Sequence, residues 1–476
     1  MALLNLEKLK KIKLQANSVV NRVIDQHVNL AVTGLSRSGK TAFITSFVNQ
    51  LINESNESKL AFFDVVHQDR FIAAKRVPQK HAHIPRFDYE GSINSLEQTE
   101  PSWPEPTAGI SEIRLAIRYR LKDSMLRYID EMGTLYVDIT DYPGEWLLDL
   151  PLLNQTFEEW SEQMCQLLQQ PPRQEHAQAF LTKIQQLDPF QSADEELLKN
   201  LAEEYTQLLH YFREQLGLSV IQPGRFILPG ELANAPILQF FPYLNFTNID
   251  VNAYQNAPDD SLIGMLRSRF VEYKERVVKK FYQQHFLRFD RQIVLADCLS
   301  PLNKGPDSFA DLQLAIKLIL ESYNYGKSSL LSRLFAPKID KLLFAATKAD
   351  HVTPEQHQHL ASLLNQLVHQ SQKQLSFDGL EMETLAIAGV KATSSGKTQY
   401  QGKTLPVIKG IKLSDQTPLT LFPGLVPKIL PDNDYWQNSP FNFIEFAPQL
   451  KTNHCQPLPH IRMDQVLQFL LGDKLK

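Results

Sequence analysis

The residues with the clearest chemical pattern are Gly34-Leu35-Ser36-Arg37-Ser38-Gly39-Lys40-Thr41, which match the phosphate-loop pattern GxxxxGK(S/T) in full. Its two glycines let the backbone curl so that successive N–H groups point at phosphate oxygens. Lys40 is expected to reach the β- and γ-phosphates, and Thr41 to offer its hydroxyl to Mg²⁺. The predicted phosphate contacts are Gly34, Ser36, Arg37, Ser38, Gly39, Lys40, Thr41 and Ala42.

Two further segments contain a GK(S/T) core without the leading glycine. Gly396-Lys397-Thr398 would need a glycine at the position of Lys391, and Gly326-Lys327-Ser328 would need one at the position of Glu321. Both segments are therefore predicted to be surface turns that bind no phosphate.

Asp141-Tyr142-Pro143-Gly144 follows residues 133–140, whose alternating apolar side chains are typical of a strand. A DxxG pattern at a strand end suits phosphate sensing, because the aspartate can hold Mg²⁺ through a water and the glycine N–H can contact a γ-phosphate. A plain turn is the alternative interpretation, and it is less favoured because a phosphate loop precedes this segment in the chain. We therefore predict Asp141 as a metal residue and Gly144 as a catalytic one.

Thr347-Lys348-Ala349-Asp350 follows a buried-strand run at residues 341–346. Asp350 could accept hydrogen bonds from N1–H and the 2-amino group of guanine, whereas adenine offers neither donor. Lys348 would lay its methylene stem over the base. Thr347, Lys348 and Asp350 are thus predicted to bind guanine, with a solvated turn as the alternative.

Residues 384–388 read as a last strand, and the segment after them is expected to touch the guanine O6. We predict Val390 for a backbone contact and Lys391 for a stacking contact. The alternative is a simple strand exit.

Residues 65–110 are polar and contain prolines, and are predicted to form a long first switch region. Thr107 is our candidate for a Mg²⁺-sensing hydroxyl because it precedes the strand expected at residues 113–120; Thr99 and Ser111 are alternatives, as is a capping role. Trp103 is predicted either to stack on the nucleotide or to anchor the loop.

Glu145 follows Gly144, where a water-orienting glutamine is common in nucleotide hydrolases of this type. The carboxylate could accept a hydrogen bond from water, but a triphosphate would repel it outward, so hydrolysis is expected to be slow. The predicted catalytic residues are Lys40, Thr107, Gly144 and Glu145. Three arginines are candidates for assistance from within the chain, and no sequence rule selects among them: Arg37, Arg86 and Arg114.

The order of these motifs is similar to that of translation-factor-related small GTPases, and several strings closely resemble the YcjX-like bacterial stress-protein family of P-loop GTPases. The strings are residues 30–41, 103–107, 113–119 and 461–473. The resemblance runs nearly end to end. It implies a protein that binds GTP or GDP with Mg²⁺ and takes part in an envelope-stress, phage-shock-like response with an unknown protein effector, such as an envelope-stress membrane protein.

Each motif follows an expected buried strand, so the strands should lie in parallel with their carboxyl ends together. We predict an α/β fold, a P-loop NTPase with a Ras-like G domain and a mostly parallel sheet, built from residues 29–144 and 290–396. About 200 residues separate Gly144 from Thr347, which requires a large insertion. Helical periodicity assigns residues 145–289 to it. An N-terminal helix at 1–28 and a small β-rich or irregular appendage at 397–476, ending in a helix at 463–471, complete the prediction.

The composition agrees with a globular protein of two or three domains: 476 residues, 43% hydrophobic and 21% charged. A net charge of −4 gives no global field for nucleic acid, so no nucleic-acid partner is predicted. The three cysteines lie too far apart in sequence for a zinc or disulfide pattern to be read from them, which favours the cytoplasm. Residues 6–24 are amphipathic and lysine-rich; they either pack on their own domain or lie at the surface of the inner membrane.

Three functions remain open at this point. The first is a slow Mg²⁺-dependent GTPase that acts as a molecular switch. The second is a nucleotide-dependent scaffold that does not hydrolyse, which Glu145 would favour. The third is a P-loop ATPase or kinase, for which the segment Thr347 to Asp350 would have no role.

Overall fold

The computed structural model describes residues 26–53, 60–122, 131–244, 246, 249–323, 339–372, 380–438, 441–449 and 456–476. The amphipathic segment at 6–24, the Gly326-Lys327-Ser328 segment and Cys455 lie outside the described residues. Cys165 and Cys298 are free and buried.

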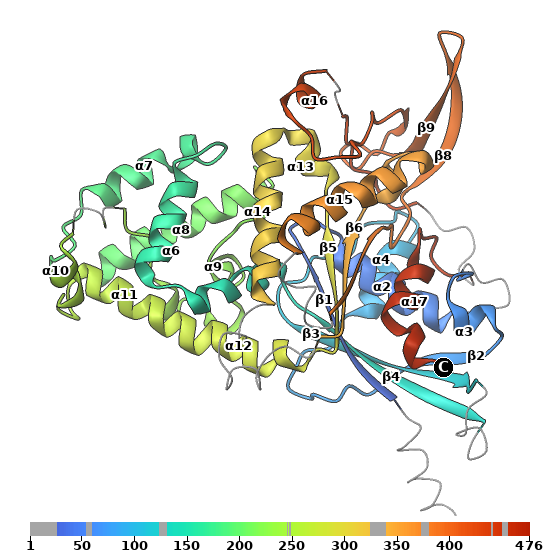
Figure 1. Ribbon diagram of the computed structural model, residues 1–476, viewed down its shortest axis with the longest axis horizontal. Helices are drawn as coiled ribbons and strands as arrows, with labels where there is room; N and C mark the ends of the chain where they lie inside the picture. Colours follow the sequence, from blue (N-terminus) through green and yellow to red (C-terminus); the bar gives the residue numbers. More distant parts are fainter. Residues whose placement is uncertain are drawn as a thin grey trace, which may run out of the picture.

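A seven-stranded sheet forms the centre of the molecule, in the order β2-β3-β4-β1-β5-β6-β7 (Figure 1). Neighbours from β4 to β7 pair in parallel, whereas β2 and β3 are antiparallel additions. The α/β class and the mostly parallel sheet predicted from the sequence are confirmed. The strands are β1 (Gln26–Gly34), β2 (Phe71–Val77), β3 (Ser111–Arg120), β4 (Met132–Asp141), β5 (Arg291–Ala296), β6 (Lys341–Ala346) and β7 (Glu381–Ala386).

The central strands are buried on both faces, which explains their nearly continuous apolar sequences. On β5, Ile293 and Leu295 join one hydrophobic core, and Val294 and Ala296 join the other. The first core packs against α2 (Lys40–Ile52) and α17 (Met463–Leu471). The second packs against the insertion and against α14 (Pro306–Ser322) and α15 (His357–Gln372) (Figure 1).

The strand register brings the predicted motifs to one edge of the sheet. Val32 pairs with Asp141, Gly34 with Leu295, and Ala296 with Ala346. Because these are parallel strands, the residues that follow their carboxyl ends must meet. The phosphate loop, the DxxG segment and the Thr347-Lys348-Ala349-Asp350 segment therefore lie together.

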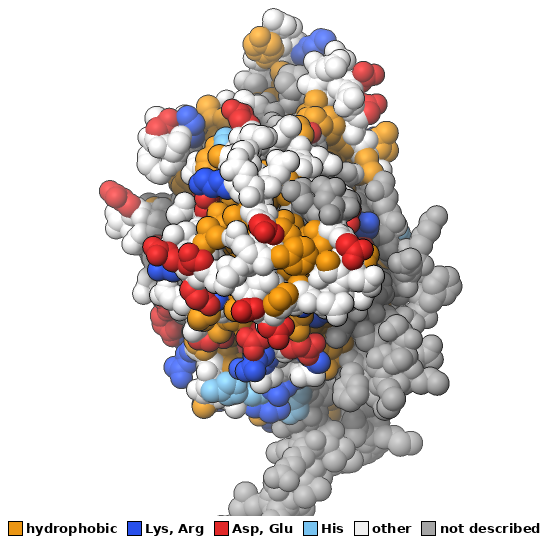
Figure 2. All heavy atoms as spheres, turned by 90° about the vertical axis from the view of Figure 1, so that its left-hand side faces the viewer, with side chains coloured by type: hydrophobic (Ala, Val, Ile, Leu, Met, Phe, Trp, Pro, Cys, Tyr) orange, Lys and Arg blue, Asp and Glu red, His pale blue; other side chains and the backbone are white. Residues whose placement is uncertain are grey.

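The segment between β4 and β5 is mostly helical, and its helices form a lobe beside the sheet (Figure 1). Its core is aromatic: the Trp160 ring packs against Phe240, Phe270 and Tyr205. Figure 2 faces the end of this lobe, where acidic, basic and hydrophobic side chains are intermixed. The helices are α5 (Gly144–Leu148), α6 (Phe157–Leu168), α7 (Gln174–Gln185), α8 (Glu195–Glu214), α9 (Gly224–Ile227), α10 (Val251–Gln255), α11 (Leu262–Glu272) and α12 (Lys279–Gln284), with a π-helix at Tyr273–Val278.

A three-stranded antiparallel sheet follows β7, in the order β10-β9-β8. Its strands are β8 (Thr393–Tyr400), β9 (Lys403–Ile411) and β10 (Pro418–Leu421). The prediction of a surface turn at Gly396-Lys397-Thr398 is wrong, because these residues lie within β8 and pair with Leu405–Val407 of β9. We call this element the C-terminal sheet; the short helix α16 (Asn433–Asn438) follows it.

The terminal helix α17 lies against the main sheet and not against the C-terminal sheet (Figure 1). Arg291, at the start of β5, is fully buried beneath it. Its guanidinium donates to the carbonyl of Leu470 and to both carboxylate oxygens of Asp473, the latter at 2.7 and 2.5 Å. This buried ion pair fixes the end of the chain under the edge of the sheet opposite the motifs.

Residues 65–110 are more regular than the switch loop predicted from the sequence. They contain β2, most of the short helix α3 (Asp64–His67), and α4 (Tyr89–Glu97), whose first turn is capped by the Asp88 side chain. The charged edge strand β2 has a weak apolar pattern, which explains why the sequence did not reveal it. In the part of the chain that the structure describes, no helix has the length and apolarity needed to span a bilayer.

Candidate nucleotide-binding site

A cavity of about 280 Å³ opens where the carboxyl ends of the parallel strands meet. It is lined by the whole predicted phosphate loop, from Gly34 to Ala42. Further predicted residues around it are Trp103, Thr107, Gly144, Glu145, Thr347, Lys348, Asp350 and Val390. Asp141 contacts two of the lining residues, whereas Lys391 lies outside the lining and donates its backbone N–H to Pro459 (2.8 Å).

We divide the cavity into two ends. The phosphate end comprises residues 34–41, Thr107, residues 141–145 and Arg213. The base end comprises Asp297, residues 347–350, residues 390–393, and Glu445 with Phe446.

The phosphate loop links β1 to α2, and its conformation depends on small residues. Gly39 has a φ of 75°, in the left-handed region that favours glycine. A Cβ on Gly34 would lie 2.2 Å from the Ser38 Oγ, so a larger residue would displace that hydroxyl. The buried Ser38 Oγ has no hydrogen-bond partner among the described residues. A buried hydroxyl in this position is suited to a polar ligand, because an unpaired polar group in the interior is costly.

Lys40 links the first two motifs. Its Nζ lies 2.7 Å from Oδ1 of Asp141 and donates to the carbonyl of Tyr142 at 2.8 Å. The other carboxylate oxygen of Asp141 accepts a 2.5 Å hydrogen bond from the Thr107 hydroxyl, which is 3.4 Å from the Thr41 hydroxyl. The three residues predicted from the sequence to hold a metal, Thr41, Thr107 and Asp141, are thus in contact.

The two motif glycines pack against each other. A Cβ on Gly144 would lie 2.2 Å from the carbonyl oxygen of Gly34. The DxxG segment can therefore approach the phosphate loop this closely only with glycine at position 144. Any movement of residues 143–145 would therefore displace the phosphate loop or break this contact.

Glu145, which we expect a triphosphate to repel outward, forms an ion pair with the helical insertion. Its side chain is 6% exposed, and its Oε1 lies 3.0 Å from Nε of Arg213, near the end of α8. The adjacent residue, Glu214, accepts a 2.5 Å hydrogen bond from Arg37 through its carbonyl. Both contacts join the helical insertion to the phosphate end, and the Arg213 guanidinium compensates the charge of the Glu145 carboxylate.

The other two arginines considered from the sequence lie elsewhere. Arg86 and Arg114 line a separate cavity together with Arg76. Arg114 faces Asp138 at 3.4 Å and stacks over the Tyr136 ring. Neither arginine lines the motif cavity, whereas Arg37 does.

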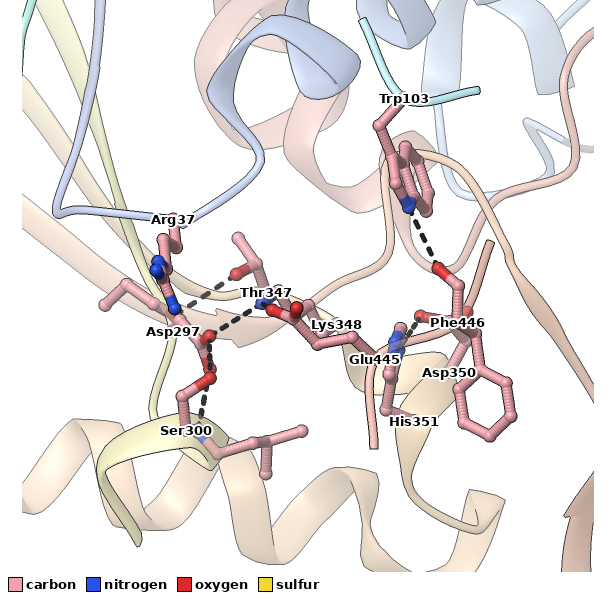
Figure 3. Close-up of polar contacts among 12 residues, drawn as sticks. Arg37, Trp103, Asp297, Ser300, Thr347, Lys348, Asp350, His351, Glu445 and Phe446 are labelled. Atoms are coloured by element: carbon pink, nitrogen blue, oxygen red, sulfur yellow. Dashed lines mark hydrogen bonds and ion pairs between the residues drawn. The ribbon is translucent and has the colours of Figure 1, made fainter. Parts of the chain in front are cut away.

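Lys348 is fixed at the base end by two carboxylates (Figure 3). Its Nζ lies 2.8 Å from Oδ2 of Asp297 and 3.4 Å from Oε1 of Glu445, and its backbone has a left-handed φ of 61°. Burial alone would lower the pKa of Lys348, but Asp297 and Glu445 outweigh it and hold that pKa above its usual value. The ammonium group is therefore charged and its methylene stem is held in place.

Asp350 is buried, and both of its carboxylate oxygens have protein partners. One oxygen accepts hydrogen bonds from the backbone N–H groups of Ala392 (2.7 Å) and Thr393 (3.2 Å); the other lies 3.2 Å from Nδ1 of His351. Burial alone would raise the pKa of Asp350, but His351 and the Ala392 amide lower it below its usual value. The group is an anchored anion at the wall of the cavity.

Trp103 connects the first switch region to the C-terminal sheet (Figure 3). Its Nε1 donates a 2.9 Å hydrogen bond to the carbonyl of Phe446, and the ring packs against the small core of Ala392, Ile408 and Phe446. The residue both lines the cavity and anchors its own loop. Thr99 and Ser111, the alternatives to Thr107, are not among the lining residues.

Three charged residues of the two ends were missed from the sequence: Arg213, Asp297 and Glu445. Asp297 directly follows β5, so its place at a strand carboxyl end was a usable signal. Its carboxylate also accepts from the backbone N–H groups of Leu299 and Ser300 at the start of α13 (Leu299–Lys304). Arg213 and Glu445 come from distant segments, and nothing local in the sequence marks them.

The chain is similar to curated proteins over nearly its whole length. A relative from Escherichia coli (strain K12), named Ras-like GTPase YcjX, is 49% identical over 468 residues, covering 98% of this chain and all of that protein. A relative of the same name from Shewanella oneidensis is 45% identical over 482 residues, covering 98% and 99% of the two chains. The model of the YcjX-like family, DUF463, matches residues 28–475. The resemblance noted in the sequence is confirmed, and the chain belongs to the YcjX-like family.

Proposed function

We propose that this protein binds GTP together with Mg²⁺, hydrolyses GTP slowly, and works as a molecular switch in a bacterial envelope-stress response. The observation that carries the proposal is the single cavity lined by residues of all three motifs, the first and last of which are more than three hundred positions apart in the chain. The name Ras-like GTPase, given to two relatives at 49% and 45% identity, supports the GTPase part of this proposal.

At the phosphate end, the loop amides and Lys40 bind the β- and γ-phosphates. Lys40 is held by Asp141 and Tyr142, so a triphosphate would compete with these contacts for its ammonium group. The backbone N–H of Gly144 is close to the loop because Gly144 packs on Gly34, and it contacts the γ-phosphate. Loss of that phosphate on hydrolysis releases residues 143–145, which makes them the moving part of the switch.

Thr41, Thr107 and Asp141 fit a magnesium ion. Their three side chains offer oxygen atoms, which Mg²⁺ prefers, and they already contact one another through the Thr107 hydroxyl. Among the described residues, no group of three or more His, Cys, Asp or Glu side chains could hold a metal, so most ligands would be phosphate oxygens and waters. When bound, Mg²⁺ neutralises the charge that develops on the phosphates.

At the base end, Asp350 and Lys348 select guanine. A carboxylate has about four acceptor sites, and the Ala392 and Thr393 amides occupy two of them on one oxygen. N1–H and the 2-amino group would therefore bind the other oxygen, in place of the His351 ring. Adenine would leave this buried anion without those donors. Val390 contributes to the wall beside the base, and Trp103 closes the cavity from the first switch region.

The cellular part of the proposal rests on family membership. We propose a cytoplasmic protein that associates with the inner membrane at its periphery, where a protein effector of the envelope-stress response would read the nucleotide state. GTP and GDP are the proposed ligands. Nucleic acid is not, in keeping with a net charge of −4.

The test is nucleotide competition on the purified full chain. Fluorescent GDP should bind, and GTP but not ATP should displace it. Asp350→Asn should shift preference from guanine to xanthine nucleotides, because the amide can donate to the 2-oxo group of xanthine; Asp415→Asn, at an exposed carboxylate, is the control. Equal displacement by ATP would support a P-loop ATPase instead. GTP binding without phosphate release under multiple-turnover conditions, alone or with cell extract, would support a non-hydrolysing scaffold.

A further inference from the structure

Among the described residues, two arginines line the motif cavity, Arg37 and Arg213. Arg37 belongs to the phosphate loop, whereas Arg213 comes from α8 of the helical insertion. The Arg213 side chain is 22% exposed, and Glu145 is the one described carboxylate within ion-pair distance of it. An arginine from a separate lobe thus lies at the phosphate end without belonging to any nucleotide motif.

Two further contacts hold the insertion in the position that places Arg213 at the phosphate end. Arg37 binds the carbonyl of Glu214, the residue next to Arg213, at 2.5 Å. On the other side of Glu145, a Cβ on Gly224 would lie 2.3 Å from the Glu145 carbonyl oxygen, so the insertion packs tightly against that segment too. The end of α8 is therefore positioned by the phosphate loop itself.

The partner of Arg213 is an anion in the lining of the cavity that a triphosphate would repel. Glu145 directly follows the glycine proposed to contact the γ-phosphate, and its carboxylate is 6% exposed. A bound triphosphate would place several negative charges beside this anion, and the Arg213 guanidinium that is paired with it lines the same cavity. The planar guanidinium can bind phosphate oxygens through two parallel hydrogen bonds. A triphosphate also carries more negative charge than one carboxylate, so it would attract Arg213 more strongly.

We propose that Arg213 is a catalytic arginine, supplied by the helical insertion, that leaves Glu145 for the γ-phosphate when GTP binds; this rests on the proposed GTPase function. Glu145 is then free to accept a hydrogen bond from the attacking water. The water oxygen bonds to the γ-phosphorus as the bond to the bridging oxygen of GDP breaks. Both water protons leave on the inorganic phosphate, and Arg213 stabilises the charge on the transferred group.

The experiment compares wild type with Arg213→Ala and Arg213→Lys in two measurements: affinity for fluorescent GDP, and single-turnover hydrolysis of GTP. We expect GDP affinity within about threefold of wild type and hydrolysis about 1000-fold slower for Arg213→Ala, the magnitude typical of such arginines. Arg267→Ala is the matched control, because Arg267 lies on α11 of the same lobe and donates to the Tyr254 carbonyl. It should behave as wild type.

A second readout separates catalysis from folding. GDP with aluminium fluoride mimics the transferred phosphoryl group, and wild type should bind this pair more tightly than GDP alone, whereas Arg213→Ala should not. Arg213→Lys keeps the charge opposite Glu145, so a structural role would restore near-normal hydrolysis; we expect at least a 100-fold loss. Hydrolysis by Arg213→Ala within threefold of wild type, or rescue by lysine, would overturn the inference. A wild type that neither binds nor hydrolyses GTP would instead overturn the proposed function.

Discussion

The phosphate end and the base end of the cavity are stabilised in different ways. At the phosphate end, Lys40 and Arg213 pair with the carboxylates of Asp141 and Glu145, which a polyanion could replace. At the base end, Asp350 is held by backbone amides, and Lys348 lies between two carboxylates. We infer that the phosphate end is built to rearrange with its ligand, whereas the base end is a fixed frame.

The largest expected effect concerns the base end, which we infer to be a fixed frame. Asp297→Ala removes the partner of Lys348 and the side-chain acceptor for the first turn of α13. Breaking a buried ion pair costs about 3 kcal/mol, which corresponds to a melting temperature lower by ~5–10 °C. Thermal unfolding followed by circular dichroism measures this change. Asp415→Ala, which breaks the exposed pair with Lys412, is the control and should leave the midpoint nearly unchanged.

The same variant has a defined pH dependence. Burial alone would raise the pKa of Asp297, but Lys348 and Ser300 lower it below its usual value. A carboxyl with a lowered folded pKa stabilises the fold above its unfolded pKa of about 3.9, and this contribution is lost as the pH falls through the folded value. The difference in stability between wild type and Asp297→Ala should therefore be constant from pH 7 to 5 and shrink below about pH 4. A constant difference down to pH 2 would contradict the role of this ion pair.

The next largest expected effect concerns the phosphate end. Lys40→Ala removes the charged donor for the phosphates, and hydrogen bonds to charged groups are worth about 1.5–3 kcal/mol, so GDP affinity should fall about 100-fold. Isothermal calorimetry with GDP and with GTP measures it. Lys397→Ala is a matched control, since Lys397 also lies in a Gly-Lys-Thr string but is exposed on β8. An equal loss of nucleotide affinity in both variants, or no loss in either, would contradict the role of the phosphate loop in nucleotide binding.

The two ends also differ in what the sequence could predict. The phosphate end follows from a contiguous eight-residue pattern whose glycines and lysine have fixed geometric roles, so Lys40 and Thr41 could be assigned before the fold was known. The alternation and the apolar runs of β1, β5 and β6 likewise predicted a parallel sheet, because such strands must be buried on both faces.

The remaining contacts depend on packing between distant segments. Arg213 and Glu145 are 68 positions apart, and Lys348 and Glu445 are 97 apart, so neither pair has a local sequence pattern. The prediction that a triphosphate repels Glu145 outward counted the phosphate charge but not the arginine brought by the insertion, which no local sequence pattern marks. The charged edge strand β2 was missed for a similar reason, since pairing with β3 and not its own composition defines it.

The smallest expected effect asks whether the two ends are coupled. Thr107 contacts Asp141 at the phosphate end, and Trp103, four residues earlier, donates to the Phe446 carbonyl at the base end. When nucleotide binding moves Thr107, the environment of Trp103 should change. Wild type should therefore show a change in tryptophan fluorescence on adding GTP, and Trp103→Phe should lose most of it.

Trp103→Phe keeps an aromatic ring but removes the Nε1–H donor, which is worth about 1 kcal/mol, so GTP affinity should weaken by no more than about fivefold. Trp436→Phe is the matched control, because the Nε1 of Trp436 donates to the Leu302 carbonyl outside the lining of the cavity. That variant should keep both the affinity and the fluorescence change. If Trp436→Phe and not Trp103→Phe abolished the signal, the first switch region would not connect the two ends, and the base end would respond to the nucleotide through α13 and α16 instead.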